Sequence, residues 1–161
     1  MRKMSIMRIL SIALLALCFG ACVTSDPEAE TTSELNSACN FSVLRSDNTN
    51  SGAVNAAYCA VLDRPADTGG FAFQLQVLNS GVSRFDLLAS FFRSAEFQTT
   101  TQSLQNVDFA TLLYRRLLLR EPDSAGLAFQ LQALINGVSR EDVFRGFISS
   151  TEFHALWLVL P

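Results

Sequence analysis

The chain has 161 residues, of which 49% are hydrophobic, and its formal net charge is −3, with 12 Lys and Arg against 15 Asp and Glu. This length allows one domain, because compact domains usually have about 100 to 150 residues. The acidic balance argues against a nucleic-acid partner, since affinity for nucleic acid comes largely from cations that displace phosphate counterions, and against electrostatic docking on anionic lipid.

Residues 1–21 have the features of a secretory signal peptide. Three cations, Arg2, Lys3 and Arg8, precede a mostly apolar run from Ile9 to Phe19. That run is too short to cross a bilayer core comfortably, because crossing needs about 20 apolar residues. We therefore expect a signal peptide rather than a transmembrane helix.

The next residues resemble a bacterial lipobox, in which two small residues precede a cysteine that is acylated on sulfur and becomes the new N-terminus. In this chain Gly20 and Ala21 precede Cys22. The resemblance implies a lipid anchor on Cys22 and a bacterial envelope location. Because Val23 rather than Asp follows the cysteine, it further implies the outer membrane. Ordinary cleavage near Ala21, giving a secreted or periplasmic protein, and an uncleaved anchor are the alternatives.

Residues 22–36 are polar and acidic with almost nothing to bury, so we expect a flexible linker behind the lipidated cysteine. Loss of the leader would lower the Lys and Arg count from 12 to 9 and leave 15 Asp and Glu, a net charge of −6 (9 − 15), with no lysine. Such a linker would hold a folded domain away from the membrane.

Four cysteines stand at positions 18, 22, 39 and 59. Cys18 belongs to the leader and Cys22 to the lipidation motif, so Cys39 and Cys59 remain. In an oxidising compartment these two can pair, closing a loop of about 20 residues and stabilising the fold by about 3 kcal/mol on the chain-entropy model. The alternative is a buried free thiol, because Cys59 lies beside Tyr58 in an apolar helical stretch.

An internal repeat is the clearest feature of the sequence. Tyr58 to Phe97 aligns without a gap on Tyr114 to Phe153, an offset of 56 residues (114 − 58). We place the two copies at about 53–98 and 109–154. The strongest matches are Phe73-Gln74-Leu75-Gln76 with Phe129-Gln130-Leu131-Gln132, and Gly81-Val82-Ser83-Arg84 with Gly137-Val138-Ser139-Arg140.

Each copy contains the same signals for helix ends. A proline turn precedes an Asp that can cap the next helix by accepting from backbone N–H groups, and a Gly suited to a left-handed conformation ends that helix. A Ser then begins a third helix with a capping-box spacing, in which Asp replaces the usual Glu. The predicted structural caps, in equivalent pairs, are Asp67 and Asp123, Gly81 and Gly137, and Ser83 and Ser139.

The apolar spacing predicts helices. Phe71, Leu75 and Leu78 recur at i, i+4 and i+7, and the second copy repeats this spacing. Most of the 13 Phe residues fall on such apolar faces and should fill the core. We therefore predict an all-α fold over residues 37–161, a small helical bundle built from an internal duplication of a roughly three-helix unit. One copy of about 45 residues is too small for a core, so both should share one, with a pseudo-twofold arrangement.

The repeat also resembles a known family. The second copy contains Arg120-Glu121-Pro122-Asp123, then Ala125-Gly126-Leu127, Gly137-Val138-Ser139-Arg140 and Thr151-Glu152-Phe153, and the first copy is a looser version. With these motifs, residues 53–155 resemble domain-of-unknown-function family 4214 (DUF4214), which is similar in places to phycobilisome-linker-like domains. The resemblance implies a helical module of secreted or surface proteins, with no established activity and no catalytic residues to carry over. Family members usually carry glycine at position 119 and Tyr-Trp at positions 129 and 130.

Few residues suggest chemistry. His154 is the only histidine, and no Cys/His cluster has a zinc-ligand spacing, so we predict no metal site and no cofactor. Paired carboxylates could perform acid–base work, but Asp67 and Asp123 fit capping positions that the duplication repeats, so we predict no catalytic residues. Arg64 and Arg120 could bind an anion or a partner, but local pairing with Asp or with helix-end carbonyls is the simpler interpretation.

These observations favour a non-enzymatic, envelope-anchored interaction or structural module that contacts the membrane through its lipid and docks an envelope or surface protein. The alternative is a small-molecule-binding or lipid-binding protein, or a hydrolase-type enzyme, with a pocket between the two copies. A third hypothesis makes Trp157-Leu158-Val159-Leu160 a binding or membrane-contact segment, although packing of this tail against the core is the simpler expectation.

Overall fold

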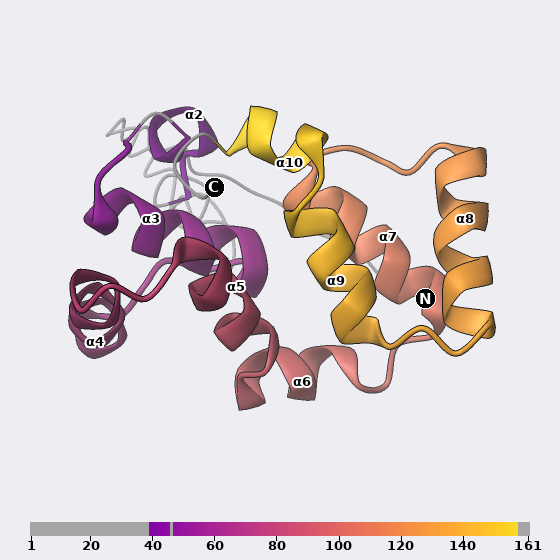
Figure 1. Cartoon of the computed structure of the whole chain (residues 1–161), viewed down its shortest axis with the longest axis horizontal. Helices are drawn as coiled ribbons and strands as arrows, with labels where there is room; N and C mark the ends of the chain where they lie inside the picture. The colour runs from indigo at the N-terminus through magenta and orange to yellow at the C-terminus, as the bar shows by residue number, and fades with distance from the viewer. Residues whose placement is uncertain (1–38, 46, 158–161) are drawn as a thin grey trace, which may run out of the picture.

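The computed structural model describes residues 39–157 except residue 46, so the predicted leader, Cys22 and the linker lie outside the described residues. Within that part of the chain every regular element is a helix and no strand occurs, which confirms the all-α prediction (Figure 1). The elements in chain order are α2 (Phe41–Leu44), α3 (Asn50–Ala57), the π-helix η1 (Tyr58–Leu62), α4 (Thr68–Asn79), α5 (Arg84–Phe92), α6 (Ala95–Thr101), α7 (Asn106–Leu117), α8 (Ser124–Ile135), α9 (Arg140–Ile148) and α10 (Thr151–Leu156).

The helices repeat in the order that the duplication predicts. With the offset of 56 residues, α3 and η1 together correspond to α7, and α4, α5 and α6 correspond to α8, α9 and α10. Between the copies, α5 packs on its counterpart α9, and η1 packs on its counterpart α7. Contacts that join an element to its own equivalent are the pattern of a twofold arrangement.

Local side-chain chemistry sets the helix ends. Asp67 and Asp123 stand at the N-caps of α4 and α8, where each carboxylate accepts from a backbone N–H three residues on. Ser83 and Ser139 do the same for α5 and α9. Beyond α4 and α8, Gly81 and Gly137 have φ of +97° and +90°, a left-handed conformation that glycine adopts without steric cost. The two glycines therefore turn the chain into the third helix of each copy.

Both copies end on a short helix fixed by an aromatic residue. Ser94 and Ser150 cap α6 and α10 by accepting from the N–H groups of Phe97 and Phe153. The rings of Phe97 and Phe153 are buried. The repeated Ser-x-Glu-Phe sequence is therefore a capped turn whose Phe belongs to the core.

One core extends across both copies. Phe92 of the first copy packs on Phe144 of the second with ring centroids 4.9 Å apart, and Phe97 contacts the same ring at 6.1 Å. Trp157 closes the core beyond α10: it is fully buried, its ring meets Phe41 edge-on at 5.6 Å, and its indole N–H donates to the Leu117 carbonyl at 2.8 Å. Trp157 is therefore a core residue, and residues 158–160 of the predicted tail lie outside the described residues.

Helices α4 and α8 occupy opposite ends of the molecule (Figure 1). Only Leu78 of α4 is buried, and no residue of α8 is. Most of the described phenylalanines belong to the core, as expected, but Phe73 and Phe129 do not and are 62% and 72% exposed. The reason is that each outer helix contacts the rest of the fold along one side only, and these two positions lie on the other side.

Candidate functional site

Four repeated side chains form one cluster in each copy. Arg64 donates to both oxygens of Glu96, with Nη2 at 2.8 Å from Oε2, and its guanidinium lies 5.1 Å from the ring centroid of Tyr58. Asp67 is farther, at 3.6 Å from Arg64 Nη1. A bidentate arginine–carboxylate pair stacked over an aromatic ring is a stable structural arrangement. The second copy repeats it with Arg120, Glu152, Tyr114 and Asp123.

The cluster corrects the sequence interpretation of Arg64 and Arg120. Local Asp partners exist, but the main partner of each arginine is the Glu of the Ser-x-Glu-Phe motif, Glu96 or Glu152, 32 residues away. Hydrogen bonds from Arg120 lower the pKa of Glu152, and burial raises the pKa of Tyr114. At neutral pH the carboxylate is therefore charged and the phenol protonated, which suits an ion pair rather than proton transfer.

A glycine in each copy allows the tyrosine to sit close to the outer helix. A Cβ built on Gly126 would overlap Tyr114 Oη and lie 3.3 Å from Tyr114 Cζ, and a Cβ on Gly70 would meet Tyr58 in the same way. Only glycine fits such a close approach. Sequence reasoning missed this role, although the repetition of both the Tyr and the Gly at the same offset could have indicated it.

The second pair of repeated arginines has different partners in the two copies. Arg140 donates to the carbonyls of Thr101 and Leu104 and lies over the ring of Phe109, so it caps the end of α6 and the loop that follows. Arg84 donates to the side chain and the carbonyl of Asn48. Both arginines therefore act as structural ties within the fold.

Cys39 and Cys59 form a disulfide with Cα atoms 5.6 Å apart. It ties the segment before α2 to η1, and the ring of Phe41 then lies against Trp157 at the far end of the chain. Of the alternatives that the sequence leaves open, the structure has the disulfide rather than the buried thiol.

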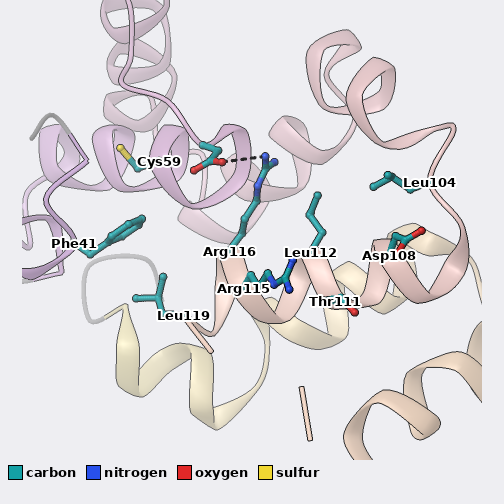
Figure 2. Close-up of a pocket in the computed structure, with 10 residues that line it drawn as sticks. Phe41, Cys59, Leu104, Asp108, Thr111, Leu112, Arg115, Arg116 and Leu119 are labelled. Atoms are coloured by element: carbon teal, nitrogen blue, oxygen red, sulfur yellow. Dashed lines mark hydrogen bonds and ion pairs between the residues drawn. The ribbon is translucent and has the colours of Figure 1, made fainter. Parts of the chain in front are cut away.

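A cleft of about 480 Å³ lies between the two copies (Figure 2). Its walls include two pairs of equivalent positions at the offset of 56, Cys59 with Arg115 and Asp63 with Leu119, so the cleft lies across the junction of the repeat. The structure therefore contains a cleft at the place where the alternative hypothesis puts a pocket.

Two cleft residues have an unusual backbone. Asp63 and Leu119 have φ of 59° and 53°, and among the described residues no other non-glycine residue has positive φ. Leu is a poor occupant of this left-handed region, at a cost of about 1 to 2 kcal/mol. The strained residue Leu119 also has its side chain in the wall of the cleft.

The outer surfaces of α4 and α8 are a second candidate. Neither helix contains a charged residue over its twelve positions. Phe73, Phe129 and Ile135 are exposed on them, the last at 72%, and Val82 and Val138 are exposed just beyond the helix ends. Surface helices usually carry charged and polar residues on their outer side. We call these surfaces the outer faces.

Within residues 39–157, residue 46 apart, no three His, Cys, Asp or Glu side chains gather so that they could hold a metal ion. His154 lies on the final helix, with its ring nitrogen 3.1 Å from the Ile148 carbonyl. None of the described helices is long and apolar enough to span a membrane.

Comparison with known proteins gives one result. The family model described as "Domain of unknown function (DUF4214)" matches the chain twice, over residues 33–101 and 89–157. A search of curated proteins finds no match. The two family matches together cover the two structural copies and the disulfide segment.

Proposed function

Since the chain belongs to the DUF4214 family as a tandem pair of its domains, we propose that it is a non-enzymatic interaction module. A lipid on Cys22 anchors it to the bacterial envelope, in the outer membrane, and the outer faces of α4 and α8 dock an envelope or surface protein. The observation that carries the proposal is the exposure of the same apolar residue, Phe73 and Phe129, on two uncharged helices.

The composition of the outer faces supports docking. Along α8 the exposed positions on the outer side are Ala125, Ala128, Phe129, Gln132 and Ile135, which are small, apolar or amide residues. A contiguous uncharged surface of this kind is typical of sites that a partner covers. An aromatic residue flanked by small ones provides a central anchor that fits a pocket on the partner.

The roles of the carboxylates support a non-enzymatic function. Asp67 and Asp123 cap helices, and Glu96 and Glu152 are held by arginines. These carboxylates hold the fold together. A general acid or base would instead need access to a substrate and a pKa near neutrality.

Two observations support export and anchoring. The lipobox-like sequence ends at Cys22, and a polar, acidic stretch follows it in the sequence. The disulfide between Cys39 and Cys59 is of the kind that persists in oxidising compartments outside the cytoplasm. Export therefore agrees with the chemistry of the folded domain as well as with the leader.

Site-specific photo-crosslinking in cells tests the docking proposal. A photoreactive amino acid replaces Phe129 or Phe73 in the full chain, and Val107, which is 42% exposed on α7, serves as the control position. We expect the same crosslinked partner from both outer faces and none from Val107. Equal products from all three positions, or none from the outer faces, would refute docking there.

Mass spectrometry of the mature N-terminus tests the anchor separately. The expected product begins at Cys22 and carries acyl chains. A product that begins elsewhere without lipid overturns the anchor and leaves the docking proposal standing.

A further inference from the structure

We propose that the cleft between the two copies binds the hydrocarbon chain of a single-chain anionic amphiphile, with the anionic head group on the guanidinium of Arg115. This site is separate from the outer faces and does not depend on the proposed docking function. A cleft of about 480 Å³ lies in the usual size range of small-molecule sites, which is about 300 to 1,000 Å³.

One part of the cleft is apolar. Phe41, Leu104, Leu112 and Leu119 come from four different segments and are each half-buried, with their side chains turned towards the cleft (Figure 2). The fold holds Leu119 there in a left-handed conformation that disfavours leucine. Backbone strain of this kind persists where the surroundings hold it in place, and it clusters at ligand sites. A hydrocarbon chain would cover apolar surface that the cleft leaves half-exposed.

The polar part of the cleft offers one cation to a ligand. Arg116 is committed to the fold, because it donates to the Val61 carbonyl at 2.9 Å and to Asp63 at 3.3 Å across the junction. Among the described residues Arg115 pairs with Glu121 alone, and both side chains are more than 60% exposed. An exposed ion pair contributes little, so Arg115 can exchange Glu121 for a ligand carboxylate at small cost.

The placement of charge favours an anionic head at Arg115. Leu112 and Leu119 flank Arg115 along the chain, whereas Asp108 lies towards the other end of the cleft (Figure 2). From Asp108 to Arg115 is seven residues of helix, or about 10 Å. The cleft therefore pairs a cation with neighbouring apolar side chains and keeps Asp108 at a distance, while its other carboxylate, Asp63, is held by Arg116. This arrangement disfavours a cationic amphiphile at Arg115.

Photolabelling of the full chain in phospholipid nanodiscs tests the inference. The probe is a long-chain carboxylate with a diazirine in the middle of its chain, and adducts are located by mass spectrometry of proteolytic peptides. We expect adducts on peptides that contain residues 104–119 or Phe41, with an excess of unlabelled carboxylate suppressing them. Adducts confined to residues 22–38 would show contact with the bilayer only and would overturn the proposal.

Matched variants and head groups sharpen the test. Leu112→Gln should lower the cleft adducts about tenfold, because a polar side chain replaces an apolar contact, and Val107→Gln on the same helix should not. Arg115→Gln should lower labelling by the carboxylate to the level given by the matching alcohol probe, and a trimethylammonium probe should label least. Thermal unfolding of each variant checks the fold. Equal labelling by the three head groups would refute the role of Arg115, and equal labelling of Leu112→Gln and the parent would refute the site.

Discussion

The contact between Tyr114 and Gly126 can be tested with one methyl group. In Gly126→Ala the new Cβ overlaps Tyr114 Oη, and the tyrosine cannot move away easily. Its ring is 5% exposed, meets Phe147 edge-on at 4.9 Å and lies under the Arg120 guanidinium at 4.9 Å. Overpacking of this kind costs about 1 to 3 kcal/mol. The gain from replacing a helical glycine by alanine offsets up to about 1 kcal/mol. We expect Gly126→Ala to lower the free energy of unfolding by up to about 2 kcal/mol, the difference between these two effects.

A double-mutant cycle separates the two effects. Tyr114→Phe removes the hydroxyl, so in that background Gly126→Ala should be neutral or stabilising, and the coupling free energy should be about 1 to 3 kcal/mol. Gly146→Ala on α9 is the matched control, because a Cβ there meets nothing within 4 Å. Urea unfolding followed by circular dichroism gives all the values. Additive effects in the cycle, or equal stability of Gly126→Ala and Gly146→Ala, would show that the close approach is not what requires glycine.

Three further predictions concern the whole fold. Cys39→Ala should lower the free energy of unfolding by about 3 kcal/mol, as expected for a cross-link with a separation of 20 residues. A reductant should lower the free energy of unfolding of the parent protein by a similar amount. A loss below about 1 kcal/mol would contradict this prediction. Acid should weaken the fold, because hydrogen bonds from Arg64 and Arg120 lower the folded pKa of Glu96 and Glu152. Their contribution to stability is complete above the ordinary value of 4.5 and is lost as the pH falls through the folded values. In urea titrations the difference in unfolding free energy between the parent and Glu152→Gln should therefore be largest at pH 7 and shrink as the pH falls below 4.5. Residues 39–101 and 102–157 expressed separately should not melt cooperatively, since Phe92 and Phe144 bury each other across the copies; a cooperative transition in either half refutes a shared core.

The features that could be predicted from sequence are those that depend on neighbouring residues. A cap such as Asp67 accepts from an N–H three residues away, and the turn at Gly81 depends on its own backbone, so both carry a local signal. Because the sequence is duplicated, each of these local patterns occurs twice, 56 residues apart. The all-α class and the duplicated unit followed from the same local patterns.

The features that could not be predicted depend on distant residues. Glu96 binds Arg64 across 32 positions, and nothing near Arg64 distinguishes that partner from Asp67. Helical spacing identified an apolar side of α4 and places Phe73, two positions after Phe71, away from it. It could not show that Phe73 stays exposed, because the sequence does not say how much of a helix its neighbours cover. The cleft likewise exists only when η1 and α7 meet.

Comparing the copies separates residues that serve the fold from residues that serve the junction. Each copy needs its own cap, its own Tyr–Arg–Glu cluster and its own close glycine, and all of these occur in both. The cleft is a single place that both copies face, so equivalent positions there need not match. Cys59, which is in a disulfide, has Arg115 as its equivalent, and Asp63 has Leu119, although both positions 63 and 119 have a left-handed backbone. The two copies thus share a left-handed residue at the cleft but supply it with different side chains, which is what an amphiphile with unlike ends requires.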